Sequence, residues 1–264
     1  MSNSQLYRQV VAAAEQAGEK MMVIYQKDFA VEQKSDSSPL TEADLAAHHH
    51  IKDALQALTP DTPILSEESA NIPWTERSQW AEYWLVDPLD GTKEFIKKNG
   101  EFTVNIAHIV DGKPVWGVVV APALGVTYAG GTATQGSEKI ESGSAQAINV
   151  APLPKGKADW CIVGSRSHQS EAFAEFVAQF DSPSITSMGS SLKICLVAEG
   201  RAHLYPRLGP TSEWDTGAAH AVLLGAGGKL VHLDTSEPLV YNQQDSVLNP
   251  FFMAAPADYA GAPK

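Results

Sequence analysis

The chain has 264 residues, of which 31 are acidic and 19 are basic, and its formal net charge at pH 7 is −12. This length suits one large domain or two closely joined halves, and a hydrophobic fraction of 44% is too high for a disordered chain. A surface this negative, with no run of Lys and Arg, argues against nucleic-acid binding.

The two cysteines, Cys161 and Cys195, stand among apolar residues. We therefore predict buried free thiols, which are typical of a reducing compartment. The sequence has no apolar run long enough to span a membrane and no basic-then-apolar signal segment at its start. These features favour a cytoplasmic protein. Peripheral contact with a membrane stays open, as does the choice between monomer and homodimer.

In the first half, apolar residues recur at helical spacing over about residues 4–27 and again after Thr41. Thr41-Glu42-Ala43-Asp44 has the spacing of an N-terminal capping box. The period then changes, and short apolar runs predict strands at 63–65, 83–86, 102–110, 114–121 and 126–129. The Gly-rich segment 130–144 is predicted to be a loop. We place a boundary near residue 150.

The second half alternates between the two kinds of element. Predicted strands lie at 160–163, 184–188, 202–205, 229–233 and 251–254. Predicted helices lie at 171–180, 191–199 and 212–224. Such alternation indicates a layered α/β arrangement. We expect an α+β subdomain over residues 1–150 and an α/β subdomain over residues 151–264, joined in one compact unit.

Acidic residues gather in four places, and most of them follow a predicted strand or open a predicted helix. They are Glu67-Glu68, Asp87 with Asp90, Asp215, and Asp36 with Asp44. Carboxylates held close together repel one another and are costly to bury. Because hard divalent cations prefer oxygen ligands, these clusters indicate a metal site.

The segment Asp87-Pro88-Leu89-Asp90-Gly91-Thr92 is the most informative of the four. Pro88 sets a turn after the strand, so both carboxylates can face one site with the Leu89 carbonyl between them. Gly91 permits close backbone approach, and a helix beginning at Thr92 would offer free N–H groups to a phosphate. The simpler interpretation is an Asx turn followed by a helix cap. Asp215 carries the same ambiguity, because Ser212-x-x-Asp215 also has capping spacing.

Taken whole, this segment resembles the signature of the inositol monophosphatase-like superfamily of magnesium-dependent, lithium-sensitive phosphatases. Further matches follow in chain order: Lys34-x-Asp36, Thr41-x-Ala43-Asp44, Glu67-Glu68-Ser69 and Trp214-Asp215-x-Gly217-Ala218. The resemblance covers about residues 5–255. It implies the αβαβα sandwich of the sugar phosphatase fold, with an antiparallel sheet in the first half and a mixed sheet in the second. Two or three Mg²⁺ ions per site are expected.

Segments outside the shared motif indicate which branch of the superfamily the chain resembles. The segments that carry this second resemblance are Asp90-Gly91-Thr92-Lys93-Glu94-Phe95, Gly164-Ser165-Arg166-Ser167-His168, Gly189-Ser190-Ser191-Leu192-Lys193 and Tyr205-Pro206-Arg207. They resemble the 3′(2′),5′-bisphosphate nucleotidases. In inositol phosphatases, Thr-Asn-Phe usually follows Gly-Thr at the position of Lys93-Glu94.

The resemblance also implies roles for single residues. Metal ligands would be Glu67, Asp87, the Leu89 carbonyl, Asp90 and Asp215. Asp36 and Thr92, with Glu67, would orient or deprotonate the attacking water. Substrate contacts would come from Glu67, Asp90, Gly91, Thr92, Lys93, His168, Ser190, Lys193, Arg207 and Asp215. Glu68 and Asp44 would lie behind the ligands, with a helix cap as the other interpretation of Asp44.

The implied reaction is magnesium-dependent removal of the 3′-phosphate from 3′-phosphoadenosine 5′-phosphate, giving AMP and phosphate. Water activated by the metal would attack in line. Whether 3′-phosphoadenylyl sulfate is a second substrate stays open, as does peripheral contact with the cytoplasmic face of the inner membrane. The resemblance further implies that residues 1–150 hold the metal ions and residues 151–264 the nucleotide, with the active site between these two halves. Two alternatives remain, namely an inositol or sugar monophosphatase and a nucleotide-binding regulator without catalysis.

Overall fold

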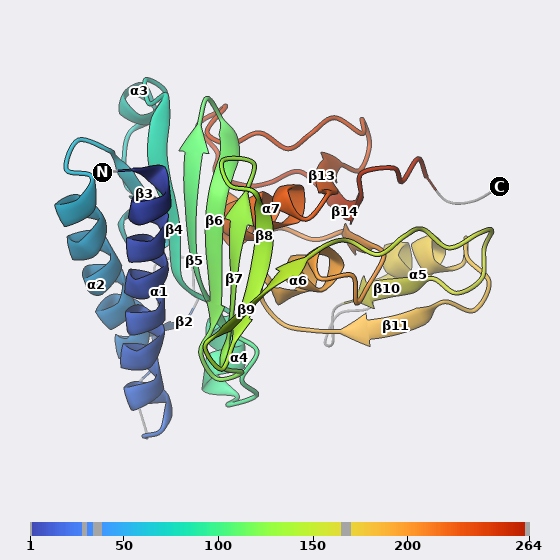
Figure 1. Ribbon diagram of the computed structural model, residues 1–264, viewed down its shortest axis with the longest axis horizontal. Coiled ribbons are helices and arrows are strands. Elements are labelled where there is room, and N and C mark those ends of the chain that lie inside the picture. The colour runs from blue at the N-terminus through green and yellow to red at the C-terminus, as the bar shows by residue number, and fades with distance from the viewer. Residues whose placement is uncertain (1, 28–30, 34–38, 165–169, 262–264) are drawn as a thin grey trace.

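The computed structural model describes residues 2–27, 31–33, 39–164 and 170–261. Its elements stack in five layers, as Figure 1 shows from left to right. Two long helices come first, followed by a large sheet, two more helices, a set of short strands, and a last helix. The expected αβαβα sandwich is therefore confirmed.

The first layer consists of α1 (Asn3–Tyr25) and α2 (Glu42–Leu58). One face of α1 buries Val10, Ala14, Ala17 and Met21 completely against the large sheet. The helix α2 begins with the predicted capping box, in which Asp44 accepts a hydrogen bond from the Thr41 backbone N–H at 2.8 Å. The helix α1 begins and ends within two residues of its predicted limits, and α2 begins directly after Thr41, as predicted.

The large sheet has seven strands in the order β3-β4-β5-β6-β7-β8-β9. Their bounds are β3 Ile64–Ser66, β4 Glu82–Asp90, β5 Thr103–Val110, β6 Lys113–Ala121, β7 Val126–Gly131, β8 Gly136–Glu141 and β9 Ser144–Ile148. Only β3 and β4 run parallel, and the other neighbouring pairs are antiparallel. The antiparallel sheet expected in the first half is thus present, with one parallel edge.

The loop predicted over 130–144 is wrong. The chain there completes β7 and forms β8, which continues through a turn into β9. The glycines of this stretch permit close strand packing, since a Cβ on Gly130 would lie 2.3 Å from Ser137 Oγ. The strand β9 is exposed except at Ile148, so it has no apolar pattern that a sequence analysis could detect.

Several short elements complete the first half, and the sequence did not predict β1, β2 or α3. They are β1 (Val31–Gln33) paired antiparallel with β2 (Pro39–Thr41), a 3₁₀ turn η1 (Glu67–Ser69), α3 (Trp74–Arg77) and α4 (Thr92–Ile96). The expected short helix at Thr92 is confirmed as α4.

In the second half, β10 (Cys161–Gly164) pairs in parallel with β11 (Ser184–Ser187). The strand β14 (Phe252–Pro256) lies between β12 (Tyr205–Arg207) and β13 (Gly228–His232), antiparallel to both. A parallel bridge between Ile162 and Leu204 connects the two groups, which makes the arrangement mixed as expected. The strand predicted over 202–205 instead covers residues 205–207.

Three helices accompany these strands: α5 (Glu171–Val177), α6 (Leu192–Ala198) and α7 (Glu213–Gly225). The helices α6 and α7 contribute to the same hydrophobic core as one face of the large sheet. The period-two alternation of strands divides the cores, because Leu85 faces this core while its neighbours Trp84 and Val86 face α1 and α2. Likewise, Val163 belongs to the central core and Ile162 to the core under α5.

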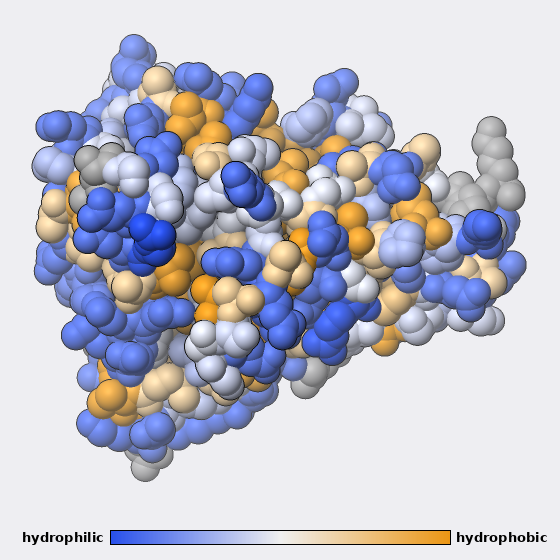
Figure 2. All heavy atoms as spheres, in the orientation of Figure 1, coloured by the Kyte–Doolittle hydropathy of each residue, from blue (hydrophilic) through white to orange (hydrophobic). Residues whose placement is uncertain are grey.

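Hydrophilic residues dominate the face shown in Figure 2, and apolar residues appear among them in small groups. In the described ranges, no helix is long and apolar enough to cross a membrane.

Candidate active site

Three carboxylates converge where the large sheet meets α7. Asp87 and Asp90 end β4, and Asp215 lies in the first turn of α7. One carboxylate oxygen from each lies within 4.8 Å of the other two. The sequence analysis predicted this juxtaposition of a strand end with a helix start, and the structure brings all three residues together.

The turn after β4 combines the two interpretations that the sequence left open. The Leu89 N–H donates to Asp87 Oδ1 at 3.0 Å, which is an Asx turn. The pairing of β4 with β5 shifts register between Asp87 and Asp90, so both side chains can reach the cluster. Gly91 has φ of 90°, and a Cβ there would lie 3.1 Å from the Glu101 carbonyl oxygen. This turn therefore needs glycine.

Backbone N–H groups also bind one carboxylate oxygen of Asp90 and one of Asp215. Asp90 Oδ2 accepts from Ser191 N at 2.6 Å, and Asp215 Oδ2 accepts from Ser212 N at 2.9 Å. Asp215 is thus a helix cap and a member of the cluster at the same time. These bonds hold the two carboxylates in the orientation in which their oxygens meet in the cluster.

Burial and mutual repulsion make this cluster basic. Removal from water raises the pKa of Asp87 well above its ordinary value, and the charges of Glu67, Asp90 and Asp215 raise it further. The same causes, burial first and Asp90 second, raise the pKa of Asp215 to about 8. A buried, proton-retaining cluster of oxygen ligands fits a hard divalent cation, whose charge would replace the bound protons.

The two glutamates differ in their position. Glu67 begins η1 directly after β3, and its charge contributes to the raised pKa values of both Asp87 and Asp215. It therefore borders the cluster, as a ligand would. The negative charge of Glu68 instead acts to raise the pKa of the His48 imidazole. His48 is a buried residue of α2, and its Nδ1 forms a hydrogen bond of 2.9 Å with Ser66 Oγ.

Asp44 is almost completely buried. It accepts a hydrogen bond of 2.6 Å from the Thr41 hydroxyl in addition to the one from the Thr41 N–H. Its second oxygen lies 3.4 Å from the Thr92 hydroxyl, which lies at the same distance from the Leu89 carbonyl oxygen. The capping role of Asp44 is therefore present in the structure. Asp36 and His168 lie outside the described residues.

Positive charge reaches the cluster from the second half. Lys193, in the first turn of α6, lies with its Nζ 5.8 Å from the ring centroid of Tyr205. Burial and the nearby Arg207 lower the pKa of Lys193, while the carboxylates of Asp90 and Asp215 act in the opposite direction. Arg207 is held by the carbonyls of Gly209 and Pro210. Lys93, in contrast, is exposed on α4.

Ser190 lies beside Asp90, and its hydroxyl donates to Asp90 Oδ2 at 2.5 Å. Three buried residues behind it were not identified from the sequence, namely Thr103, Asn105 and Ser191. Asn105 and Thr103 lie directly opposite Asp87 and Asp90 in the β4–β5 pairing. The strand register therefore identifies these two residues as neighbours of the site, and the sequence pattern alone does not.

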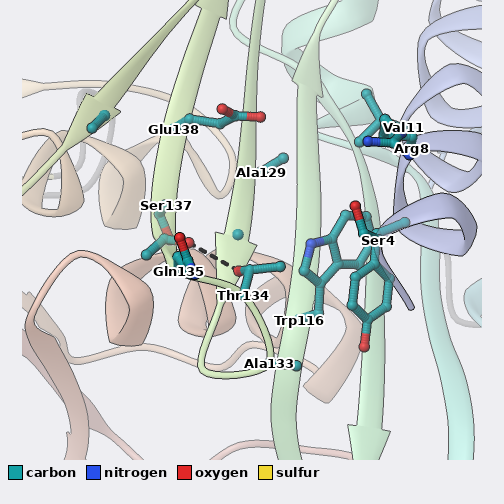
Figure 3. A pocket seen from close by; sticks show the side chains of 14 residues that line it. Ser4, Arg8, Val11, Trp116, Ala129, Ala133, Thr134, Gln135, Ser137 and Glu138 are labelled. Carbon is teal, nitrogen blue, oxygen red and sulfur yellow. Dashed lines mark hydrogen bonds between the residues drawn. The ribbon is translucent and has the colours of Figure 1, made fainter. Parts of the chain in front are cut away.

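A separate hollow of about 600 Å³ lies between the first turns of α1 and the strands β6 to β8. Figure 3 shows Trp116 and Ser4 on one side of it and Ser137 and Glu138 on the other. None of the three clustered carboxylates lines this hollow. The chemistry expected from the sequence is therefore not located there.

Comparison with known proteins agrees with this arrangement. Residues 2–259 match the inositol monophosphatase family. The Escherichia coli (strain K12) protein "3′(2′),5′-bisphosphate nucleotidase CysQ" is 50% identical over 251 residues, which are 92% of this chain and 97% of that protein. Its namesake in Haemophilus influenzae is 38% identical over 95% of this chain and 93% of its own length.

A solved structure is similar throughout. The crystal structure of CysQ from Bacteroides thetaiotaomicron, described as a bacterial member of the inositol monophosphatase family, superimposes with a TM-score of 0.81 at 37% identity. The match covers 96% of this chain and 97% of that one. The chain belongs to the inositol monophosphatase family. Within the family, its similarity to the bisphosphate nucleotidases CysQ is the one that the sequence motifs predicted.

Proposed function

We propose that this chain is a magnesium-dependent 3′(2′),5′-bisphosphate nucleotidase, which releases the 3′-phosphate of 3′-phosphoadenosine 5′-phosphate and leaves AMP. One observation carries the proposal. Carboxylates from β4 and α7 share a site with two cationic side chains from α6 and β12, Lys193 and Arg207. A substrate with two phosphates needs both kinds of group, one to hold cations at the phosphate that reacts and one to bind the phosphate that stays.

The residues that would hold two or three Mg²⁺ ions are Glu67, Asp87, the Leu89 carbonyl, Asp90 and Asp215. Bound Mg²⁺ would lower the pKa of a water molecule and neutralise the departing oxygen. The chain's own contribution is to orient the three aspartate carboxylates in advance through the backbone N–H groups of Leu89, Ser191 and Ser212. Asp36 and Thr92 are the proposed groups for orienting the water.

The remaining proposed residues bind substrate. Gly91 and Thr92 would contact the scissile phosphate at the start of α4, and Ser190 would face it from the second half. Lys193, Arg207, His168 and Lys93 would bind the nucleotide and its second phosphate, because charged donors bind phosphate strongly. Local cations are needed here, since the whole chain carries a net charge of −12 that repels an anionic substrate.

The proposal includes a cytoplasmic location and two functional halves. The thiols of Cys161 and Cys195 are both free, which supports a reducing compartment. The large sheet ends at Ile148, which supports a boundary near residue 150 between a metal-binding part and a nucleotide-binding part.

The test is phosphate release from 3′-phosphoadenosine 5′-phosphate, with inositol 1-phosphate and AMP in parallel, each with and without Mg²⁺. Release from the bisphosphate alone, dependent on Mg²⁺ and stopping at AMP, is the expected result. Faster turnover of inositol 1-phosphate would favour a monophosphatase and overturn the roles given to Lys193 and Arg207. Nucleotide binding without release of phosphate would indicate a regulator.

A further inference from the structure

A chain of buried hydroxyl groups lies directly behind Asp90 and joins the two halves of the molecule. The Thr103 hydroxyl of β5 lies 2.5 Å from Ser190 Oγ and 2.9 Å from Ser191 Oγ. Ser191 Oγ in turn donates to Asn105 Oδ1 at 2.8 Å. Thr103, Asn105 and Ser191 are each at most 4% exposed. Water therefore has little access to this network, and the protein itself must satisfy its hydrogen bonds.

Counting protons gives the network a direction. The Ser190 hydroxyl donates to Asp90 Oδ2, the same oxygen that accepts from the Ser191 N–H. Its one proton is then used, so a hydrogen bond across the 2.5 Å contact requires the Thr103 hydroxyl as the donor. The Thr103 hydroxyl also lies 2.9 Å from Ser191 Oγ and 3.3 Å from Asn105 Oδ1, and the contact with Ser190 is the shortest of the three. The proton of Thr103 consequently determines which way the Ser190 hydroxyl points. Asn105 Nδ2 stays buried without a hydrogen-bond partner in the described part of the chain, opposite Asp87 in the sheet.

The backbone at this point is held in an unfavourable shape. Ser190 has φ of 54°, a left-handed conformation that is unfavourable for a residue with a side chain. The preceding Gly189 packs so closely that a Cβ would lie 2.7 Å from the Glu101 carbonyl oxygen. A glycine at position 190 would relieve the strain but would lose the hydroxyl that reaches Asp90. The geometry therefore indicates that this hydroxyl has a role.

We propose that Thr103 is a positioning residue for the metal site. By donating to Ser190, Thr103 directs the serine hydroxyl onto Oδ2 of Asp90, where the Ser191 N–H also binds, and leaves Oδ1 for the cation. This inference rests on the proposed function, because it assumes that Asp90 is a ligand. It also explains how α6, which carries Lys193, is held at a fixed position relative to the carboxylates.

The experiment compares three variants of the full chain by isothermal titration with Mg²⁺ alone and by thermal unfolding. Thr103→Val keeps the shape and removes the donor, and Mg²⁺ affinity should fall about tenfold, as is usual when a group behind a metal ligand is lost. Thr103→Ser restores the hydroxyl and should return the affinity to within about twofold of the starting protein. Thr127→Val removes the hydroxyl of a buried threonine on β7, which donates to Glu15 on α1, and it should leave the Mg²⁺ affinity unchanged.

A Thr103→Val protein that unfolds more easily but binds Mg²⁺ as tightly as the starting protein would overturn the proposal, since the network would then be merely structural. If Thr103→Val does not fold, Ser191→Ala breaks the network one step further back, and unchanged Mg²⁺ affinity in that variant has the same meaning. If the starting protein hydrolyses the bisphosphate and binds Mg²⁺, such a failure concerns Thr103 only. If it binds no Mg²⁺ at all, the proposed function fails as well.

Discussion

At the level of single residues, the three clustered carboxylates share one design. Asp87, Asp90 and Asp215 each give one oxygen to a backbone N–H, at 3.0, 2.6 and 2.9 Å respectively. Each also brings one carboxylate oxygen within 4.8 Å of the other two residues. These bonds fix the orientation of the side chains before any cation arrives, which lowers the entropy lost on binding.

Asp215→Asn should separate the effects on function and on stability. The amide keeps the shape and can still accept the Ser212 N–H, but it removes a ligand charge. We expect activity to fall at least about 1,000-fold, because a bound metal contributes several kcal/mol to the transition state. Without metal at pH 8, we expect unfolding to require about 1–3 kcal/mol more, because a buried repulsion disappears.

Denaturant unfolding in a metal chelator, together with phosphate release, measures both effects. Asp181→Asn, on the exposed surface, is the matched control and should change neither. A metal-free Asp215→Asn protein less stable than the starting chain would show that the carboxylate stabilises the fold instead of straining it.

At the level of elements, the position of α7 depends on a segment with little regular structure, residues 241–249. Asn249 Nδ2 lies 2.7 Å from the Ser212 carbonyl oxygen and 3.1 Å from Thr216 Oγ1. The Asn242 N–H binds both oxygens of Glu213 at 2.9 Å, and the buried Arg77 of α3 binds Asn242 Oδ1 at 2.7 Å. The helix that carries Asp215 is thereby held at its first turn from outside.

Asn249→Leu should loosen that hold. It removes one of two donors from each acceptor, because the Ser212 carbonyl keeps the Asp215 N–H and the Thr216 hydroxyl keeps the Tyr241 hydroxyl. The loss of such hydrogen bonds costs about 0.5–1.5 kcal/mol each. We expect that loss in denaturant unfolding, together with weaker Mg²⁺ binding. Asn149→Leu changes an exposed asparagine and should have neither effect. Unchanged Mg²⁺ affinity in Asn249→Leu would mean that this segment stabilises α7 without positioning Asp215.

The elements α6 and β12 bring the two cations to the site, so Lys193→Met should alter substrate binding more than turnover. The side chain keeps most of its apolar length and loses its charge. We expect KM for 3′-phosphoadenosine 5′-phosphate to rise about 10- to 100-fold, the usual effect of losing a charge-assisted bond. The KM for 3′-AMP, which lacks the 5′-phosphate, should rise much less. Lys113→Met on the exposed start of β6 is the control, and equal effects on both substrates would contradict the role given to Lys193.

At the level of the whole molecule, the predictions from the sequence were correct where the spacing of apolar residues marks a helix or a strand. The helices α1, α2 and α7, the central strands and the meeting of Asp87 with Asp90 and Asp215 follow from apolar spacing and from acids at element ends. The sequence-based prediction failed where the residues of a strand are exposed or where glycines allow strands to pack closely, as in β8 and β9. It also failed for Thr103 and Asn105, because their role depends on which residues lie opposite them in the sheet. Strand register is a property of the folded molecule.

The pH dependence of stability should likewise depend on the whole site and on its metal. In the metal-free protein, the pKa values of Asp87 and Asp215 lie above those of an unfolded chain, so the folded state binds more protons. Stability is then lost as pH rises, by up to about 1.4 kcal/mol per pH unit for each extra proton. His220 acts oppositely, since burial lowers its pKa to about 3 and stability is lost as pH falls below about 6.5.

Of these three groups, only Asp87 and Asp215 still change the stability with pH above pH 6.5. Mg²⁺ should reverse their effect because it binds the ionised carboxylates. We therefore expect metal-free stability to fall by about 2 kcal/mol between pH 6.5 and 8, and saturating Mg²⁺ to flatten that slope. The increase in melting temperature on adding Mg²⁺ should consequently be larger at pH 8 than at pH 6.5. Thermal unfolding at both pH values, with Mg²⁺ or with chelator, measures the difference. Parallel slopes in the two conditions would show that the cation binds elsewhere than at Asp87 and Asp215.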